Sequence, residues 1–175
     1  MIADPAGDAA LNPGEVPPGY VDALAMGADR IGDTFVFAFR LAAPIPATFD
    51  PPSPYNALLW SFCLDTDPRS SPDGYPFVNI GPVPCDFIVA AHSEGGPVTG
   101  TLMDRRPLAV GKDAVTGEIP VAIDGANGTI TVPAASLGDP SRFMWAMSAS
   151  AVTFPLPNND FVDIDADYEH MHRYP

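Results

Sequence analysis

Four aspartates gather in one stretch of this 175-residue chain, where their side chains could do chemistry together. Asp65 and Asp67 follow an apolar run. Asp73 lies in the Pro-rich segment that comes next, and Asp86 opens the following apolar run. Carboxylates held at one end of a strand pair repel one another unless positive charge lies among them, and Arg69 is the nearby basic residue. Because calcium takes six to eight oxygen ligands, the cluster predicts a bound calcium ion; a solvated acidic loop is the alternative.

A second acidic pair, Asp4 and Asp8, lies in the N-terminal sequence DPAGD. It could be joined by Asp22, or by carboxylates near the C-terminus such as Asp160 and Asp163. Asp-Pro and Ala-Gly-Asp sequences also form ordinary turns, because Asp bonds to its own backbone and Gly supplies positive φ. Calcium ligation and a simple turn are therefore both open for this pair.

The aspartates of the first cluster must be positioned by the apolar runs that flank them. In Leu58–Asp65 the even positions are all large and apolar, which is the period-two pattern of a strand on a core. Phe87–Ala91 reads as the returning strand. Thr34–Ala42 and Arg142–Val152 show the same alternation strongly, with Phe, Leu, Trp and Met on one face.

The rest of the chain predicts shorter elements joined by loops. The 22 prolines and 15 glycines disfavour long helices, because proline breaks helix interiors. Strands are also expected at Tyr20–Ile31 and Pro97–Asp104, a loop at Val110–Gly117, and a helical turn at Pro133–Leu137. Glu118–Val132 reads as a hairpin turning at Asn127-Gly128. We therefore predict an all-β fold, a two-sheet antiparallel β-sandwich (jelly-roll or immunoglobulin-like) with long Pro-rich loops and little helix.

The length of the chain and its net charge limit the number of domains and the classes of partner that can be expected. Residues 1–175 are expected to form a single domain, with a loop-rich segment at 1–19 and an acidic surface tail at 154–175. The formal net charge of −14 argues against nucleic acid and anionic membranes as partners. No apolar run is long enough for membrane insertion. The N-terminus lacks the basic and apolar regions of a signal peptide, so a mature protein or an excised domain is expected.

Cys63 and Cys85 fall on the two strands expected to be neighbours. A disulfide between them would indicate an oxidising compartment, and so a secreted or cell-surface protein. The alternative is a pair of buried thiols.

Several motifs occur in an order that resembles the DOMON-like and family-9 carbohydrate-binding-module-like β-sandwich domains of secreted bacterial proteins. They are DPAGD at the N-terminus, TFVFAFRL, LDTD at Leu64–Asp67, CDFIV at Cys85–Val89, and GTITVPAASLG before FMWAMSAS. The resemblance implies a sandwich stabilised by calcium that accompanies other modules and binds carbohydrate, or haem in some branches. It carries Asp65, Asp67, Asp86, Asp4 and Asp8 over as site residues, whereas Cys85 departs from the family pattern.

Carbohydrate binding needs exposed aromatic faces beside hydrogen-bonding groups. Trp60 and Trp145 share strand faces with other large apolar residues, so they are expected in the core. The loop aromatics Tyr55, Tyr75 and Phe77 are better placed to bind a ligand, with ordinary surface exposure as the alternative.

The sequence therefore predicts a non-catalytic extracellular β-sandwich stabilised by calcium, with polysaccharide or neighbouring protein modules as its partners. The alternative is a structural subunit or spacer of a surface layer, filament or larger secreted protein, capable of self-assembly. A small hydrolase is the third interpretation, but no nucleophile motif supports it.

Overall fold

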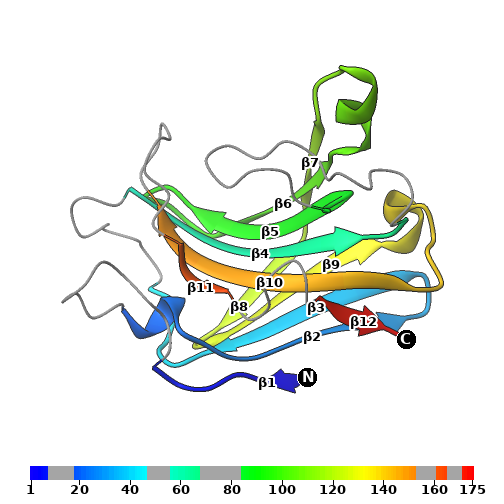
Figure 1. Ribbon diagram of the computed structural model, residues 1–175. Coiled ribbons are helices and arrows are strands. Elements are labelled where there is room, and N and C mark those ends of the chain that lie inside the picture. Colours follow the sequence, from blue (N-terminus) through cyan, green and yellow to red (C-terminus); the bar gives the residue numbers. More distant parts are fainter. Residues whose placement is uncertain (8–17, 47–55, 68–83, 153–160, 165–170) are drawn as a thin grey trace.

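Two antiparallel sheets stack face to face in the computed structural model of the chain (Figure 1). The structure describes residues 1–7, 18–46, 56–67, 84–152, 161–164 and 171–175. Within these residues the smaller sheet has five strands in the order β1-β2-β3-β9-β8. The larger sheet runs β11-β10-β4-β5-β6-β7, and β12 also pairs with β10. The predicted two-sheet β-sandwich is confirmed.

The strands lie close to where the alternating patterns placed them. In chain order they are β1 (Ile2–Ala3), β2 (Ala23–Ile31), β3 (Thr34–Leu41), β4 (Ala57–Asp65), β5 (Phe87–Ser93), β6 (Thr99–Asp104), β7 (Val115–Ile119), β8 (Val121–Asp124), β9 (Asn127–Pro133), β10 (Phe143–Val152), β11 (Phe161–Ile164) and β12 (His172–Tyr174). The described helices are short 3-10 segments: η1 (Gly19–Val21), η2 (Arg106–Val110) and η3 (Ala134–Leu137). No helix in the described part of the chain is long and apolar enough to cross a membrane.

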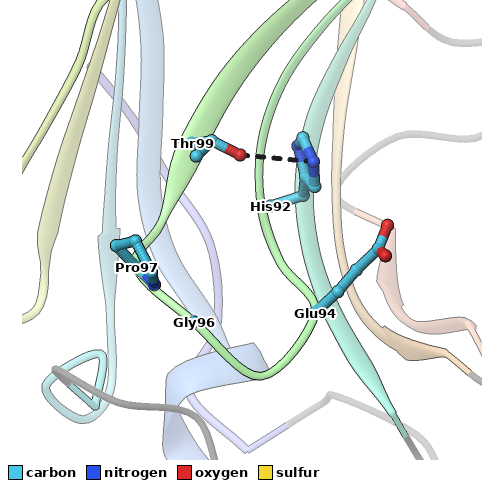
Figure 2. Close-up of a pocket in the computed structure, with 5 residues that line it drawn as sticks. All are labelled: His92, Glu94, Gly96, Pro97 and Thr99. Atoms are coloured by element: carbon cyan, nitrogen blue, oxygen red, sulfur yellow. Dashed lines mark hydrogen bonds between the residues drawn. The ribbon is translucent and has the colours of Figure 1, made fainter.

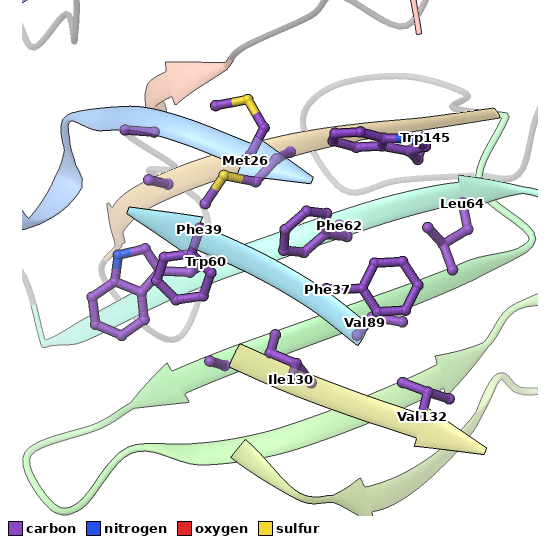
Figure 3. Packing of buried hydrophobic residues seen from close by; sticks show 14 of the residues in the cluster. Met26, Phe37, Phe39, Trp60, Phe62, Leu64, Val89, Ile130, Val132 and Trp145 are labelled. Carbon is purple, nitrogen blue, oxygen red and sulfur yellow. The ribbon is translucent and has the colours of Figure 1, made fainter. Parts of the chain in front are cut away.

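Aromatic side chains from the facing sheets fill the core (Figure 3). Phe37 and Phe39 on β3 lie against Phe62 on β4, with ring centroids 5.3 and 6.5 Å away. Trp60 stacks on Phe39 at 6.0 Å and has no exposed surface. Trp145 is also buried. Both tryptophans therefore belong to the core, as their strand faces predicted.

The hairpin of β8 and β9 turns two residues earlier than predicted. Asp124 pairs with Asn127, so Gly125 and Ala126 form the turn and Asn127 already belongs to β9. Gly125 has a φ of +59°, which glycine adopts without steric cost. The prediction of a turn at Asn127-Gly128 is wrong because Asp124-Gly125, an equally good turn signal, precedes it.

Gly128 is needed for packing rather than for turning. It lies opposite Phe39 in the ladder between β3 and β9. A Cβ atom at position 128 would come within 2.0 Å of the Phe39 ring. The ring thus covers the bare backbone of the glycine, and this position accepts no larger residue without displacing a core aromatic.

Parts of two segments predicted as loop and surface tail are strands. β7 occupies the end of the predicted 110–117 loop and pairs with β6. In the predicted 154–175 tail, β11 and β12 both pair with the outer edge of β10. Met171, just before β12, is 7% exposed and packs in a small cluster with Cys63, Cys85 and Ala146. The end of the chain therefore helps to cover the larger sheet.

Candidate functional site

Cys63 and Cys85 form a disulfide, which confirms the predicted pairing. Cys63 lies in β4, Cys85 directly precedes Asp86, and both cysteines are buried. It therefore fixes the end of the strand pair at which the first acidic cluster gathers. A disulfide is consistent with an extracellular location.

Asp86 is the centre of this first cluster. Its side chain is 1% exposed, and its Oδ2 atom accepts three hydrogen bonds from the segment that follows β4. The main-chain N–H and the hydroxyl of Thr66 donate at 2.8 and 2.7 Å, and the N–H of Asp67 donates at 2.9 Å. The Thr66-Asp67 turn thus wraps around the carboxylate. These donors satisfy one oxygen of the buried carboxylate without a metal ion.

Asp65 is the member of the cluster whose surroundings disfavour the ionised carboxylate. It is 8% exposed, and burial raises the pKa of its carboxyl from 3.8 to about 6. The nearby charges of Asp86 and Asp67 add to this rise in pKa, and a main-chain hydrogen bond from Asp67 opposes it. The structure therefore places Asp65, Asp67 and Asp86 at one end of the sheet, but the three do not form a group that could hold a metal ion within the described residues.

A buried arginine at this end of the sheet was missed by the sequence reasoning. Arg105 is 2% exposed; its N–H donates to the Asp86 carbonyl at 2.8 Å, and its Nη1 donates to the Cys85 carbonyl at 3.3 Å. The position of Arg105 could have been predicted from the expected strands. If the strand at 97–104 pairs antiparallel with the Phe87 strand, Arg105 comes to lie beside Asp86. The guanidinium of Arg105 therefore reaches the carbonyl of a disulfide-bonded cysteine, at the same end of the sheet as the first acidic cluster.

The raised pKa of Asp65 predicts a specific pH dependence of stability. Because the folded carboxyl keeps a proton that the unfolded chain releases between about pH 4 and 6, this group weakens folding as the pH rises through that window. In the presence of chelator, Asp65→Asn should raise the free energy of unfolding near pH 7 by about 1 kcal/mol, after allowance for solvent screening. The gain should vanish below about pH 4. Urea unfolding of both proteins across this range measures it; a destabilised variant near pH 7 would contradict the account.

The N-terminal turn forms a second acidic site around Asp22. The N–H of Asp4 donates to the Leu24 carbonyl at 3.0 Å, and the N–H of Gly7 donates to Oδ2 of Asp22 at 2.9 Å. Asp22 is 8% exposed. Its Oδ1 atom is fully buried and accepts no hydrogen bond from the residues that the structure describes. The Oδ2 atom of Asp4 is buried as well, so a carboxylate of the DPAGD turn and the carboxylate of Asp22, the residue before β2, each have a desolvated oxygen here.

A buried carboxylate oxygen without a donor is costly, by about 1–3 kcal/mol in typical cases. A cation would offset that cost at Asp22. In the described ranges no three acidic, histidine or cysteine side chains form a group that could hold a metal ion. Further ligands at this site would therefore come from main-chain carbonyls, from water, or from residues outside those ranges.

The other predicted site residues lie outside the described part of the chain. They are Asp8 and Asp73 for the metal, and Tyr55, Tyr75 and Phe77 for the ligand. These predictions stay predictions.

A shallow pocket lies at the hairpin between β5 and β6 (Figure 2). It is lined by His92, Glu94, Gly96, Pro97 and Thr99. Nε2 of His92 lies 3.3 Å from the Thr99 hydroxyl, while Glu94 points away from this pair. Ligand sites are usually concave and largely apolar with a few convergent polar groups, whereas this pocket is open and has no Phe, Tyr or Trp among its lining residues. It does not form an evident binding site.

Comparisons with known proteins do not add a family. No protein-family model matches the chain, and neither a curated protein nor a solved structure matches it. The resemblance to DOMON-like domains therefore stays a prediction.

Proposed function

We propose that this protein is a non-catalytic β-sandwich module of an extracellular protein, stabilised by calcium and acting in carbohydrate binding or as an accessory module. The observation that carries the proposal is Asp22, a buried carboxylate with one oxygen that accepts no hydrogen bond from the described residues. A bound cation is the simplest partner for that oxygen, since a buried charge is otherwise paired or hydrogen-bonded.

The chemistry of the donor set suits calcium. Oδ1 of Asp22 and Oδ2 of Asp4 are carboxylate oxygens, and Asp8 follows Gly7 directly in the chain. Calcium accepts carboxylates, main-chain carbonyls and water at six to eight positions in flexible geometry. Transition metals would prefer nitrogen or sulfur ligands, which neither aspartate supplies.

The disulfide supports the extracellular part of the proposal, because such bonds persist in oxidising compartments. Calcium sites of extracellular modules commonly bind with dissociation constants of about 10⁻⁴ to 10⁻³ M. A site with two protein carboxylates fits that weak range, so the ion would be bound outside cells and lost in the cytosol.

The calcium site is tested by thermal melting with excess calcium and then with chelator. A ligand that binds only the folded state stabilises it by about 2.7 kcal/mol at a hundredfold excess over its dissociation constant. For a chain of this size that corresponds to a rise in Tm of about 5–10 °C. We expect Asp22→Asn to abolish the rise, because the amide keeps the bond from Gly7 but loses the charge.

Two variants serve as controls for this measurement. Asp33→Asn removes an exposed aspartate from the turn after β2 and should keep the full calcium response. Asp67→Ala tests the first cluster: loss of the response there, with Asp22→Asn unaffected, would place the ion at the Asp86 end of the sheet and contradict the Asp22 site.

Carbohydrate binding is tested separately by affinity electrophoresis of the calcium-loaded protein in gels that contain soluble polysaccharides. We expect retardation by at least one polysaccharide, and loss of it when Tyr55, Tyr75 and Phe77 are replaced by alanine. Aromatic stacking on sugar faces needs those rings, whereas removing them should leave Tm unchanged. Equal mobility in every gel would reject carbohydrate as the ligand.

The second candidate function is a structural or spacer module that contacts further protein modules. The observation that favours it is the exposed β7, which lies at the end of the larger sheet and pairs on its outer edge with no strand among the described residues. Strand edges of this kind are templates for pairing with another chain.

A further inference from the structure

Residues 104–119, from the end of β6 through η2 to the end of β7, form a segment that we call the arm, and its η2 part projects from the sandwich (Figure 1). Residues 115 to 118 of β7 are all exposed, including Val115 at 62%. A Cβ atom added at Gly117 would meet no atom within 4 Å. Val115 and Gly117 lie on the same face of β7 as Ile119, which packs against the core. The smaller sheet therefore does not reach beneath this part of β7.

Side-chain contacts of Arg106 tie the start of the arm to the larger sheet, which helps to fix the position of the β7 edge. Arg106 forms a two-point ion pair with Asp104 at 2.9 and 2.7 Å. Its guanidinium also lies 4.4 Å from the centre of the Phe87 ring. The side-chain hydrogen bonds from Arg106 lower the pKa of Asp104, so the pair stays charged at neutral pH.

Compared with the other described sheet edges, the edge of β7 is poorly protected. β1, β11 and β12 are two, four and three residues long, and β8 has four residues with Pro120 before it. β7 has five residues, no proline and a single charged side chain, Glu118. Native edges are usually blunted by short length, charge, proline or a bulge.

Charge also distinguishes the arm from the rest of the molecule. The chain carries a net charge of −14, which opposes contact between two copies. Between Asp104 and Ile119, however, three acidic residues balance three basic ones. They are Asp104, Asp113, Glu118, Arg105, Arg106 and Lys112. Two copies can therefore meet at their arms without the repulsion that their remaining surfaces would feel.

We propose that residues 112–118, which comprise the first four residues of β7 and the three residues before it, pair antiparallel with the same residues of a second copy, about a two-fold axis at Val115. In this register Val115 lies opposite its own counterpart, which covers two exposed apolar side chains. Lys112 lies opposite Glu118 of the other copy, and the symmetry creates this opposite-charge pair twice. Asp113 lies opposite Gly117, so no like charges face one another. The pairing joins the two larger sheets into one and leaves both acidic sites free.

The test is sedimentation equilibrium of the whole chain over a concentration series, with the charge-reversal variants Lys112→Glu and Glu118→Lys. Opposite-charge pairs across strands contribute about 0.2–1 kcal/mol each, and like charges cost similar amounts. Each single reversal turns two attractive pairs into two repulsive ones, so we expect the dimer dissociation constant to rise at least about fourfold. The double variant restores opposite charges and should return to within about threefold of the wild type, which repulsion between net charges alone cannot produce.

Glu94→Lys is the matched control, since it makes the same charge change on the exposed hairpin of β5 and β6. It should leave dimerisation near the wild-type value. Circular dichroism melts check that each variant folds, and Val115→Lys gives an independent disruption at the axis. A wild-type chain that stays monomeric up to about 1 mM, or a dimer indifferent to Val115→Lys and to both charge reversals, overturns the proposal. Neither outcome bears on the calcium site, because the arm and Asp22 share no contact in this account.

Discussion

Trp60→Ala should destabilise the fold by about 3–5 kcal/mol, the range typical for removing a buried aromatic ring. The side chain has no exposed surface and stacks on Phe39 from the other sheet. Its Nε1 also donates to the Tyr20 carbonyl at 2.9 Å, which ties β4 to the segment before β2. Truncation therefore opens a cavity between the sheets and removes a hydrogen bond at its rim.

Guanidinium denaturation followed by circular dichroism measures this loss. Trp60→Phe separates the two contributions: it keeps most of the ring but removes the donor, so a loss of about 1–3 kcal/mol is expected. Ile31→Ala is the control, because Ile31 is 68% exposed and should change stability by less than about 0.5 kcal/mol. If Trp60→Ala cost no more than this control, the assignment of Trp60 to the core would be wrong.

Replacing both cysteines by alanine should cost about 3 kcal/mol. Cys63 and Cys85 are 22 residues apart, and closing a loop of that length restricts the unfolded chain by about this amount in the chain-entropy description. The closed loop contains Asp65 and Asp67 and ends next to Asp86, so the geometry of the first acidic cluster depends on the bond. The alanines leave no free thiol, and Met171 and Ala146 continue to cover the site.

The same denaturation assay with and without a thiol reductant tests this prediction. Reductant should lower the unfolding midpoint of the wild type and leave the double-alanine variant unchanged. Equal midpoints for oxidised and reduced wild type would mean that the disulfide adds nothing to stability, and the structural role assigned to it would fail.

The sandwich could be predicted from sequence because its central strands carry their own signal. In β3, β4 and β10 large apolar residues line one face over eight to ten residues, and most residues of the other face are small or polar. A period-two pattern of that length specifies both the strand and the face that it buries. The same alternation placed Trp60 and Trp145 in the core.

Short edge elements could not be predicted in the same way. β7, β11 and β12 have three to five residues each and acquire their conformation by pairing with β6 or β10. Local pattern does not report such pairing, because edge residues are free to be polar. The role of Gly128 likewise depends on Phe39, a residue 89 positions away on another strand.

The acidic residues illustrate the same limit. The density of carboxylates in the sequence identified Asp65, Asp67 and Asp86 as a cluster, and the structure places them at one end of the larger sheet. Sequence could not show that Thr66 and Asp67 donate three bonds to Asp86, or that Arg105 is buried beside its backbone. It also gave no reason to rank Asp22 above the others, since that rank comes from burial without a hydrogen-bond donor at Oδ1.

The most direct test of the central claim is a calorimetric calcium titration of the chelator-treated wild type and of Asp22→Asn. The account predicts a saturable binding site in the wild type, weaker than about 10⁻⁵ M as in extracellular modules, and no binding at that site in Asp22→Asn. Heats indistinguishable from dilution in the wild type, or an unchanged isotherm in Asp22→Asn, would contradict it.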